Sequence, residues 1–473
     1  MIYVDKKSKL PLYEQVYSQI KNQILSGQIS AGELLTPTRV LAEELDVGRN
    51  TVDKAYQQLK DEGYVTATVG KGFTVNDIPS ISVDPEPLVR RDTNVEESTE
   101  AHIGYDFVYG SMDNSLFPYR RWGACSRDAL IEMEYEQVAQ YPEKNGDIRL
   151  RRAICDHINK ARNVNCSPEQ IVITCGHQHS MEILANIFYG KNAPKRPSFT
   201  MDDPGYDGVR KVFENRGFHV GGVTVEKDGV AVRELKGRHV DLLYLTPSHQ
   251  FPAGSVLSAS KRRELLNWAE ETDSYIIEDD YDSELRYYTN PIPSMQSMDV
   301  SGRIIYTGTF SKAFSPVMRM AYIVFPPEIL KWYNDYYWRY NSQVNGFLQR
   351  TMAIFMERGY YERQINKTRT VYGRKMRALL AAMEKIFGDD VRITGGRAGM
   401  HILADFNLRD EKGKKMMQEE IIRRAESVGV RIYPTRILYQ DPAHCPDSQV
   451  LFGISTIDEE DMEMLMKLFS SAL

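Results

Sequence analysis

Four short apolar runs, separated by helical stretches, most constrain what this chain of 473 residues can fold into. The runs are residues 171–174, 242–245, 275–277 and 304–306. Strands without polar alternation are buried on both faces, which indicates a mostly parallel sheet covered by helices on both sides. Sheets of this α/β class bind ligands at the carboxyl ends of their strands. The residues that follow each run are therefore the first candidates for a functional site.

The fourth run continues through small hydroxyl residues to Ser311 and Lys312, and Arg319 follows. A lysine amine held at a strand end can form a Schiff base with an aldehyde cofactor. Small side chains and an arginine can hold the phosphate of that cofactor nearby. A lone lysine at a strand end is more often a surface residue. Polar groups also follow the other three runs, and that recurrence favours a cofactor site.

The other strand ends carry glycine, histidine and carboxylate groups. Gly176, His177 and Gln178 follow the first run, where helical amides can point at an anion. His249 lies in the polar segment 246–254 after the second run. The third run leads into the acidic segment 278–284. An aspartate there can pair with a protonated pyridine nitrogen, although a solvated loop or a metal site is an alternative reading.

The N-terminal segment has the pattern of a winged helix-turn-helix. Apolar residues recur every four positions from Leu12 to Ile24, a second short helix is predicted over 39–45, and a third is predicted to begin near Asn50 as its N-cap. The segment 64–75 predicts a hairpin, the wing. An ordinary small helical domain is the alternative. The residues predicted to contact DNA are Arg39, Arg49, Asn50, Thr51, Lys54 and Lys71.

Composition limits the kind of protein to which this N-terminal segment belongs. Residues 1–75 hold nine Lys or Arg and nine Asp or Glu, so DNA binding must depend on local placement of cations. No apolar run approaches the roughly 20 residues of a membrane helix. Five scattered cysteines without a CxxC motif favour a reducing cytoplasm and argue against a zinc site. We expect a DNA-binding domain over 1–76, an acidic, proline-bearing linker over 77–103 and a large domain over 104–473.

In their order along the chain, these motifs resemble the MocR/GabR family of bacterial regulators over nearly the whole length. The matching residues are Pro37, Arg39, Leu41, Ala42, Asn50, Thr51, Val52, Ala55, Tyr56, Leu59, Glu62, Gly63, Tyr64, Phe117, Pro118, Trp122, Tyr141, Gly146, Gly176, Gln178, Asp203, Pro204, Gly205, Tyr206, Thr246, Pro247, Ser248, His249, Gln250, Pro252, Gly254, the segment 278–284, Gly308, Thr309, Phe310, Ser311, Lys312 and Arg319. The combination is specific, although each short motif is not.

The resemblance implies a GntR-type winged helix-turn-helix joined to a fold-type I aminotransferase-like domain. The latter would have a large part with a mostly parallel sheet and a smaller C-terminal α+β part. It also implies a cytoplasmic homodimer that binds operator DNA and pyridoxal 5′-phosphate (PLP). The effector would be PLP itself, an amine or an amino acid. Two alternatives are an active PLP-dependent aminotransferase and a body that binds no cofactor and only dimerises.

The resemblance also assigns roles to individual residues. Lys312 would form the Schiff base with PLP, Asp279 rather than Asp280 would pair with the pyridine nitrogen, and Tyr281 would contact the phenolic oxygen. The remaining cofactor contacts would be Tyr206 on the ring, His177, Gln178, Ser311 and Arg319 at the phosphate, His249 near the phenolic edge, and Tyr141 reaching the phosphate of the neighbouring subunit.

The chain departs from the aminotransferase pattern where a substrate carboxylate is usually held. Many aminotransferases carry an arginine in a late strand, but the comparable segment 450–455 has none. A relative that senses a carboxylate has an arginine shortly after the Pro-Gly-Tyr motif, where this chain has Asp207 and Gly208. Arg397, Arg431 and Arg436 are the alternatives, and each is equally compatible with a place on the surface.

Overall fold

The computed structural model describes residues 2–78, 103–133, 138–192, 194–289, 292–410 and 412–473. The chain divides into two compact units, Met1–Ser98 and Thr99–Leu473. The division falls within the predicted linker 77–103, of which residues 79–102 lie outside the described residues. We call the first unit the head and the second the body.

In its described residues, 2–78, the head consists of three helices and a two-stranded wing. The helices are α1 (Leu12–Leu25), α2 (Thr38–Glu44) and α3 (Arg49–Asp61), and the wing is β1 (Val65–Thr68) paired antiparallel with β2 (Gly72–Val75). Val16, Ile20 and Ile24 of α1 are buried against Val52 and other residues of α3. The predicted N-cap at Asn50 is wrong. Gly48 in extended conformation precedes α3, and Asn50 lies in its first turn with an exposed side chain.

The body is built around an eight-stranded sheet in the order β4-β11-β10-β9-β8-β5-β6-β7. The strands are β4 (Ile171–Thr174), β5 (Ser198–Asp203), β6 (His219–Glu226), β7 (Gly229–Val230), β8 (Leu242–Leu245), β9 (Tyr275–Asp280), β10 (Ile304–Thr309) and β11 (Ala321–Val324). Neighbours from β10 to β6 are parallel, whereas β11 runs antiparallel to β10 and β4. All residues of β4, β8, β9 and β10 are buried, which confirms the predicted doubly covered sheet.

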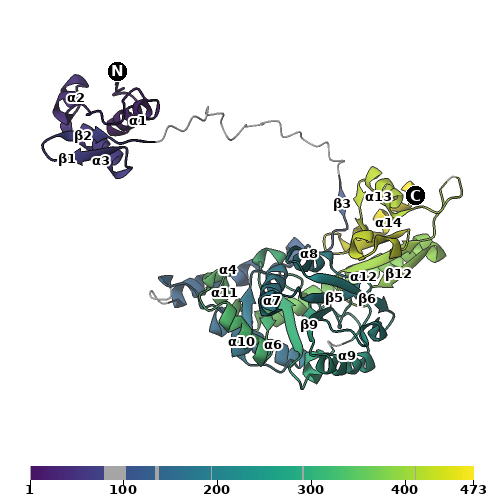
Figure 1. Cartoon of the computed structure of the whole chain (residues 1–473). Helices are drawn as coiled ribbons and strands as arrows, with labels where there is room; N and C mark the ends of the chain where they lie inside the picture. The colour runs from purple at the N-terminus through teal and green to yellow at the C-terminus, as the bar shows by residue number, and fades with distance from the viewer. Residues whose placement is uncertain (1, 79–102, 134–137, 193, 290–291, 411) are drawn as a thin grey trace. The chain divides into compact units, whose positions relative to one another are not determined.

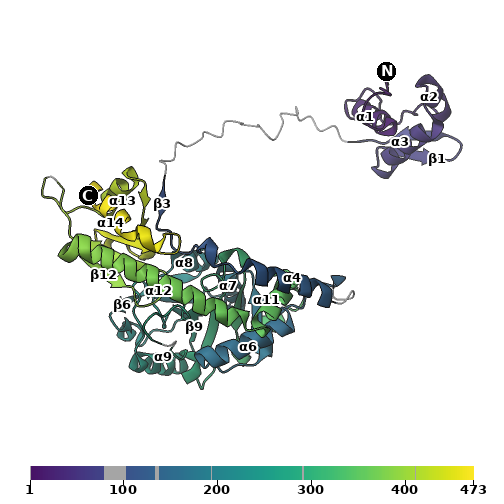
Figure 2. The same cartoon turned by 180° about the vertical axis from the view of Figure 1, so that it is seen from behind.

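Helices cover both faces of this sheet (Figures 1 and 2). Helices α7 (His177–Asn192), α8 (Asp207–Asn215) and α10 (Pro327–Tyr336) bury one face, including Tyr244, Ile277 and Ile305. The other face packs on α9 (Ala259–Glu271), and on α4 (Tyr119–Glu132), α6 (Ile148–Arg162) and α11 (Gly346–Glu357). Because strand side chains alternate between faces, neighbouring residues of β9 point to different helices.

The long helix α12 (Tyr360–Phe387) extends from α11 to a smaller C-terminal part, as Figure 2 shows. A second sheet there has the order β12-β13-β16-β15, formed by β12 (Val391–Gly395), β13 (His401–Phe406), β16 (Gln449–Gly453) and β15 (Tyr433–Pro434). Two short parallel strands, β14 (Val430–Arg431) and β3 (Tyr105–Asp106), pair beside it, and α13 (Gln418–Ser427) and α14 (Met462–Ala472) complete this part.

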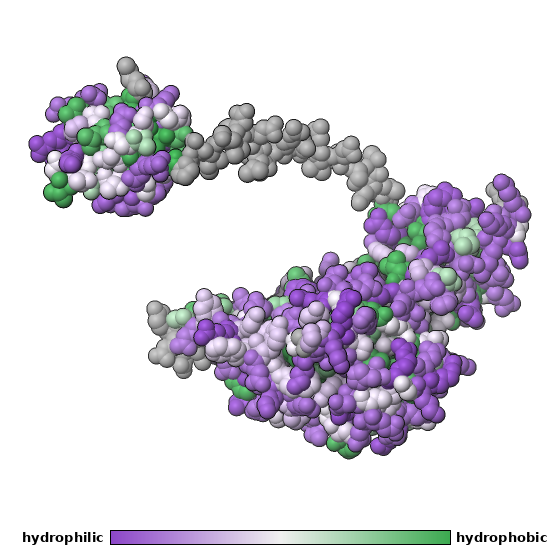
Figure 3. All heavy atoms as spheres, viewed as in Figure 1, coloured by the Kyte–Doolittle hydropathy of each residue, from purple (hydrophilic) through white to green (hydrophobic). Residues whose placement is uncertain are grey.

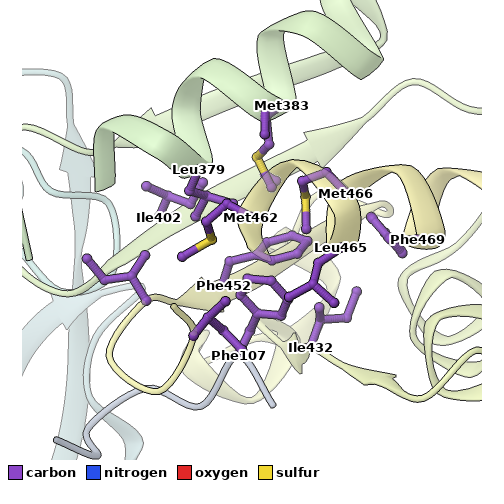
Figure 4. Packing of buried hydrophobic residues seen from close by; sticks show 14 of the residues in the cluster. Phe107, Leu379, Met383, Ile402, Ile432, Phe452, Met462, Leu465, Met466 and Phe469 are labelled. Carbon is purple, nitrogen blue, oxygen red and sulfur yellow. The ribbon is translucent and has the colours of Figure 1, made fainter. Parts of the chain in front are cut away.

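Apolar residues from distant segments form the core of this smaller part. Figure 4 shows Phe452 of β16 beside Phe107, which follows β3, with Met383 of α12 and Phe469 of α14 around them. The rings of Phe107 and Phe452 meet edge to face, with 5.3 Å between centroids. This core ties β3, at the start of the body, to the C-terminal sheet.

The face of the body seen in Figure 3 is largely hydrophilic. Within the described parts of the chain, no helix is both long enough and apolar enough to cross a membrane.

Candidate functional site

The residues that follow β4, β8, β9 and β10 meet around one cavity of about 340 Å³. Its lining consists of Tyr109, Gly110, Ser111, His177, Gln178, Tyr206, Tyr244, Thr246, Phe251, Asp279, Tyr281, Thr309, Ser311, Lys312, Pro316 and Arg319. The sequence prediction thus placed eight of these residues in a common site: His177, Gln178, Tyr206, Asp279, Tyr281, Ser311, Lys312 and Arg319. The carboxyl edge of a parallel sheet is where such a site is expected.

Lys312 reaches this cavity from the loop after β10. Its Nζ lies 4.0 Å from the centroid of the Tyr109 ring. Gly110 allows this approach, since a Cβ on Gly110 would lie only 2.9 Å from the lysine nitrogen. Burial lowers the pKa of the Lys312 amine to about 8, although the charges of Asp282 and Asp279 oppose that shift. A lysine with a lowered pKa is partly neutral near physiological pH, as a nucleophilic amine requires.

Asp279 and Asp280 point to opposite faces of the sheet. Oδ2 of Asp279 accepts a hydrogen bond of 2.5 Å from the Tyr244 hydroxyl, and Oδ1 accepts a weaker one of 3.3 Å from Thr307. Asp280 instead forms a buried ion pair with Arg162, behind the sheet. Of the two aspartates, only Asp279 lines the cavity.

Burial raises the pKa of Asp279, and the nearby His177 and the Tyr244 hydrogen bond offset part of that shift. A buried carboxylate of this kind gains from a cationic partner in the cavity. Nε2 of His177 lies 3.4 Å from Oδ2 of Asp279, and neither imidazole nitrogen has a hydrogen-bond partner among the described residues. The Asp279 carboxylate fits the protonated ring nitrogen of a pyridine cofactor.

A second set of lining residues is suited to an anion. His177 and Gln178 begin α7, so their backbone N–H groups lack acceptors within the helix. Gly176, at φ +97°, leaves room for Arg319, because a Cβ there would lie 2.8 Å from the guanidinium. Arg319 itself has a left-handed backbone, with φ 44°. Ser311 accepts a hydrogen bond from the Thr309 hydroxyl. Helix amides, a hydroxyl and a guanidinium are a fitting set for a phosphate.

Tyr281 and His249 are linked, but only Tyr281 lines the cavity. The Tyr281 hydroxyl donates to the His249 backbone carbonyl at 3.0 Å and lies 3.1 Å from Nδ1 of the same histidine. The same Nδ1 is 2.8 Å from Oδ2 of Asp282. His249, which is 3% exposed, therefore lies behind Tyr281 instead of at the cavity surface.

Tyr206 and Tyr141 occupy different surroundings. Tyr206 lines the cavity and packs its ring edge to face on Phe251, with 6.0 Å between centroids. Tyr141 is 84% exposed and does not line the cavity of its own chain.

None of the three arginines considered for a carboxylate lines the cavity. Arg397 is exposed, Arg431 lies 3.9 Å from Asp106, and Arg436 lies 3.3 Å from Glu419.

On the head, the predicted DNA-binding residues lie on α2, on α3 and at the wing. Arg39, Arg49, Asn50, Lys54 and Lys71 are exposed, and Thr51 is half-buried. Nε of Arg49 lies 3.3 Å from Asp53, one turn along α3. The Lys54 amine lies 3.8 Å from the centroid of the Tyr13 ring, so that lysine rests on α1.

Sequence reasoning missed Tyr244 and Tyr109. Tyr244 lies within a predicted strand. It pairs with Ile277, which is two residues before Asp279 in β9, so Tyr244 lies on the same side of the sheet as Asp279. Tyr109 follows β3 in a segment without a recognisable motif. Its ring stacks on Phe251, with 4.9 Å between centroids. Only its proximity to Lys312 in the folded chain shows that it belongs to the site.

Comparison with known proteins agrees with this two-part organisation. Residues 12–75 match the model of the bacterial regulatory proteins of the gntR family, and residues 119–450 match that of class I and II aminotransferases. The HTH-type transcriptional regulator YdeL of Bacillus subtilis is 33% identical over 99% of this chain and 98% of its own. The probable rhizopine catabolism regulatory protein MocR of Rhizobium meliloti is 29% identical over 98% and 94%. The chain belongs to the MocR/GabR family.

The family explains both units. MocR-type proteins are transcriptional regulators whose aminotransferase-like part is PLP-dependent, and the gntR-type head binds DNA. Among solved structures, the α-aminoadipate aminotransferase LysN from Thermus thermophilus superposes with a TM-score of 0.68 at 24% identity, covering 78% of this chain and 91% of LysN. That likeness confirms the fold-type I architecture predicted for the body.

Proposed function

We propose that this MocR-type regulator binds PLP through a Schiff base at Lys312 and that the state of this site controls operator binding by the head. The observation that carries the proposal is the placement of Lys312. Its amine, with a pKa lowered to about 8, lies in a cavity that is also lined by Asp279, by Arg319 and by the first residues of α7. The cavity thus offers a separate partner for each polar part of the cofactor.

Each part of the cavity has a role in this proposal. Bound PLP supplies an aldehyde and a pyridine ring that serves as an electron sink. Asp279 holds a proton on the ring nitrogen, and Tyr244 fixes the orientation of that carboxylate. Arg319, Ser311 and the α7 amides hold the phosphate, while Tyr206 packs on the ring. Tyr281 contacts the phenolic oxygen, and His249, whose backbone carbonyl accepts from the Tyr281 hydroxyl, acts behind it as a positioning residue.

We also propose that the protein is a cytoplasmic homodimer. An exposed Tyr141 that lies outside its own cavity is compatible with a role at the site of a second copy. Two heads reading two half-sites would give the affinity and specificity that a single small head lacks. The effector would be PLP, an amine or an amino acid. The DNA-binding head and the regulatory relatives favour this function over aminotransferase turnover.

Borohydride reduction of the PLP-loaded protein tests the proposal. We expect a visible absorption band, and after reduction we expect the pyridoxyl label on Lys312 alone in peptide mass spectra. Lys312→Ala should lose the band while its circular dichroism is unchanged. Lys144→Ala is the matched control, because Lys144 is also a half-buried lysine whose pKa is lowered by burial, but it lies outside the cavity. A label on another lysine would refute the assignment.

The regulatory half of the proposal needs a DNA measurement. Operator fragments selected from random DNA would be titrated with the full chain, with and without PLP, and the affinity read by fluorescence anisotropy. We expect PLP to change the affinity of the unsubstituted protein but not that of Lys312→Ala. Equal DNA affinity with and without PLP in both proteins would show that the cofactor site does not control operator binding.

A further inference from the structure

One side of the cavity lining is aromatic and is backed by leucines from the C-terminal part of the body. Phe251 and Tyr281 line the cavity and form a buried cluster with Leu403, Leu438 and Leu451. Tyr109 and Tyr206, which also line the cavity, pack against the same cluster. We call this set of seven residues the apolar wall. Phe251, Tyr281 and Tyr206 follow strands of the large sheet, whereas Leu403 lies in β13 and Leu451 in β16, so both parts of the body contribute.

Leu451 is the key member of the wall. It lies in β16, the late strand in which many aminotransferases carry a carboxylate-binding arginine. Its strand neighbours Val450 and Phe452 belong to the core of the C-terminal part, whereas Leu451, only 4% exposed, packs in the apolar wall. The alternation of strand side chains therefore points Leu451 toward the cavity side of β16. At this position of the strand an apolar side chain thus packs behind the aromatic lining, although it does not itself line the cavity.

The described residues offer no spare cation elsewhere in the lining. The charged or chargeable bases there are Lys312, Arg319 and His177. Under the proposed function, the cofactor engages the first two, and His177 lies beside Asp279. Arg210, which follows Tyr206 in the chain, is also committed, because it donates to the backbone carbonyls of Tyr439 and Ile437.

The electrostatic environment also disfavours a second anion. The charges of Asp282 and Asp279 act on both Lys312 and Tyr109, since they oppose the lowering of the lysine pKa and add to the raising of the tyrosine pKa. A ligand carboxylate placed against the apolar wall would lose its hydration without gaining a cationic partner. Burial of such an unpaired carboxylate is strongly unfavourable.

We propose that the effector of this regulator is a primary amine that carries an apolar or aromatic group and no carboxylate. Its nitrogen would form a C–N bond to the imine carbon of the cofactor as the C–N bond to Lys312 breaks, so that Lys312 leaves as the free amine. The apolar group would pack on Phe251 and the aromatic residues beside it, which Leu451 supports from behind. The inference rests on the proposed function, because it assumes PLP in the cavity. It excludes amino acids as the preferred effectors, which the proposed function by itself leaves open.

A matched pair of stable cofactor adducts tests this preference directly. N-(5′-phosphopyridoxyl)-L-leucine and N-(5′-phosphopyridoxyl)-isopentylamine differ only by a carboxylate, and neither needs to react with Lys312. Their dissociation constants for the full-length apo protein would be measured by calorimetry beside that of PLP. We expect the isopentylamine adduct to bind at least tenfold more tightly than the leucine adduct.

The outcomes separate the two proposals. Equal binding, or tighter binding of the leucine adduct, overturns the inference and leaves the cofactor site standing. Binding of PLP with neither adduct also overturns it, and would make PLP the effector. If PLP and both adducts fail to bind, the proposed function itself falls and the inference falls with it.

Leu451→Arg adds a test of the position, with Leu451→Met as a control of similar size. A folded Leu451→Arg protein should reverse the preference toward the leucine adduct, whereas Leu451→Met should keep that of the unsubstituted protein. An unchanged preference in folded Leu451→Arg would overturn the role of Leu451. The adduct pair on the unsubstituted protein decides the ligand class even if that substitution prevents folding.

Discussion

Nε of Arg162 lies 2.6 Å from Oδ2 of Asp280, in a buried ion pair on the face of the sheet opposite the cavity. Asp279, which directly precedes Asp280 in β9, faces the cavity. Tyr306 adds a hydrogen bond to the same oxygen of Asp280. Two adjacent aspartates thus have separate roles, because successive side chains of a strand point to opposite faces. Asp279 contributes to the ligand site, and Asp280 joins α6 to the sheet.

Substitution of each aspartate by asparagine should separate these roles. Asp280→Asn leaves Arg162 charged and unpaired, so we expect the free energy of unfolding to fall by about 3–5 kcal/mol. Asp279→Asn removes a carboxylate whose pKa is raised by burial, so apo stability should be unchanged or slightly higher. It should instead weaken PLP binding. Urea unfolding and PLP titration of both variants check this, and equal loss of stability in the two would contradict it.

The lowered pKa of Lys312 predicts unusual reactivity at neutral pH. With a pKa of about 8, roughly one-tenth of the amine is neutral at pH 7, against about one part in 2,500 for an ordinary lysine. Trace acetylation of the apo protein from pH 6.5 to 11, followed by peptide mass spectrometry, gives a titration curve for each lysine. The midpoint for Lys312 should lie near pH 8. A midpoint above pH 10 would show that burial does not shift this amine.

The same pKa fixes the sign of a stability change. Between pH 8 and about 10.5 the unfolded chain keeps a proton that the folded apo protein has lost at Lys312. The free energy of unfolding should therefore rise with pH across this window, relative to that of Lys312→Met. Below pH 8 both states hold the proton, so the difference between the two proteins should be constant there.

Much of the site could be predicted because its residues follow apolar strands directly. Lys312, Asp279 and Gln178 each come within a few residues of a buried strand, and a parallel sheet brings such ends together. Strand β6 was missed because Gly221 and Gly222 interrupt its apolar pattern. Strand β11 was also missed, although it is as short and as buried as β4 and β8.

Contacts between distant segments could not be read from the sequence. Tyr109 reaches Lys312 from the start of the body, and Leu451 packs behind the cavity lining from the C-terminal sheet. His249 carried a motif but no clue that Asp282 would bind it behind Tyr281. Such placements depend on how the two sheets of the body pack, which periodicity within one segment does not encode.

The head should read DNA mainly through Arg49. It begins α3, is exposed, and can pair with guanine through two hydrogen bonds once it leaves Asp53. Arg49→Ala should weaken specific binding by about 1–3 kcal/mol and relax the preference at one base pair per half-site. Arg49→Lys is the matched control, since it keeps the charge but loses the two-fold hydrogen bonding.

Lys71 at the wing should behave differently from Arg49. It lies between β1 and β2 and presents charge without a fixed hydrogen-bond pattern. Lys71→Ala should weaken binding to all sequences about equally and reduce the salt dependence by about one phosphate contact. Anisotropy titrations at three salt concentrations, with specific and scrambled DNA, distinguish the two residues. Unchanged affinity in both Arg49 variants would mean that another surface faces the operator.

Tyr141 should complete the cofactor site of the partner subunit. It is exposed in its own chain, so Tyr141→Ala should leave the fold intact. Loss of a hydrogen bond to a charged phosphate costs about 1.5–3 kcal/mol, which corresponds to roughly 10- to 100-fold weaker PLP binding. Tyr141→Phe should weaken binding equally, because only the hydroxyl would reach the phosphate.

Mixed dimers decide whether Tyr141 acts in its own subunit or in the partner. Lys312→Ala and Tyr141→Ala subunits, carrying different affinity tags, would be co-expressed and purified as heterodimers. If Tyr141 acts across the interface, one site of each heterodimer combines an intact Lys312 with an intact Tyr141 from the other subunit. Half of the sites should then bind PLP with the affinity of the unsubstituted protein. If Tyr141 acts within its own subunit, no site of the heterodimer regains that affinity. A body that sediments as a monomer would contradict the shared site without any mixed dimer.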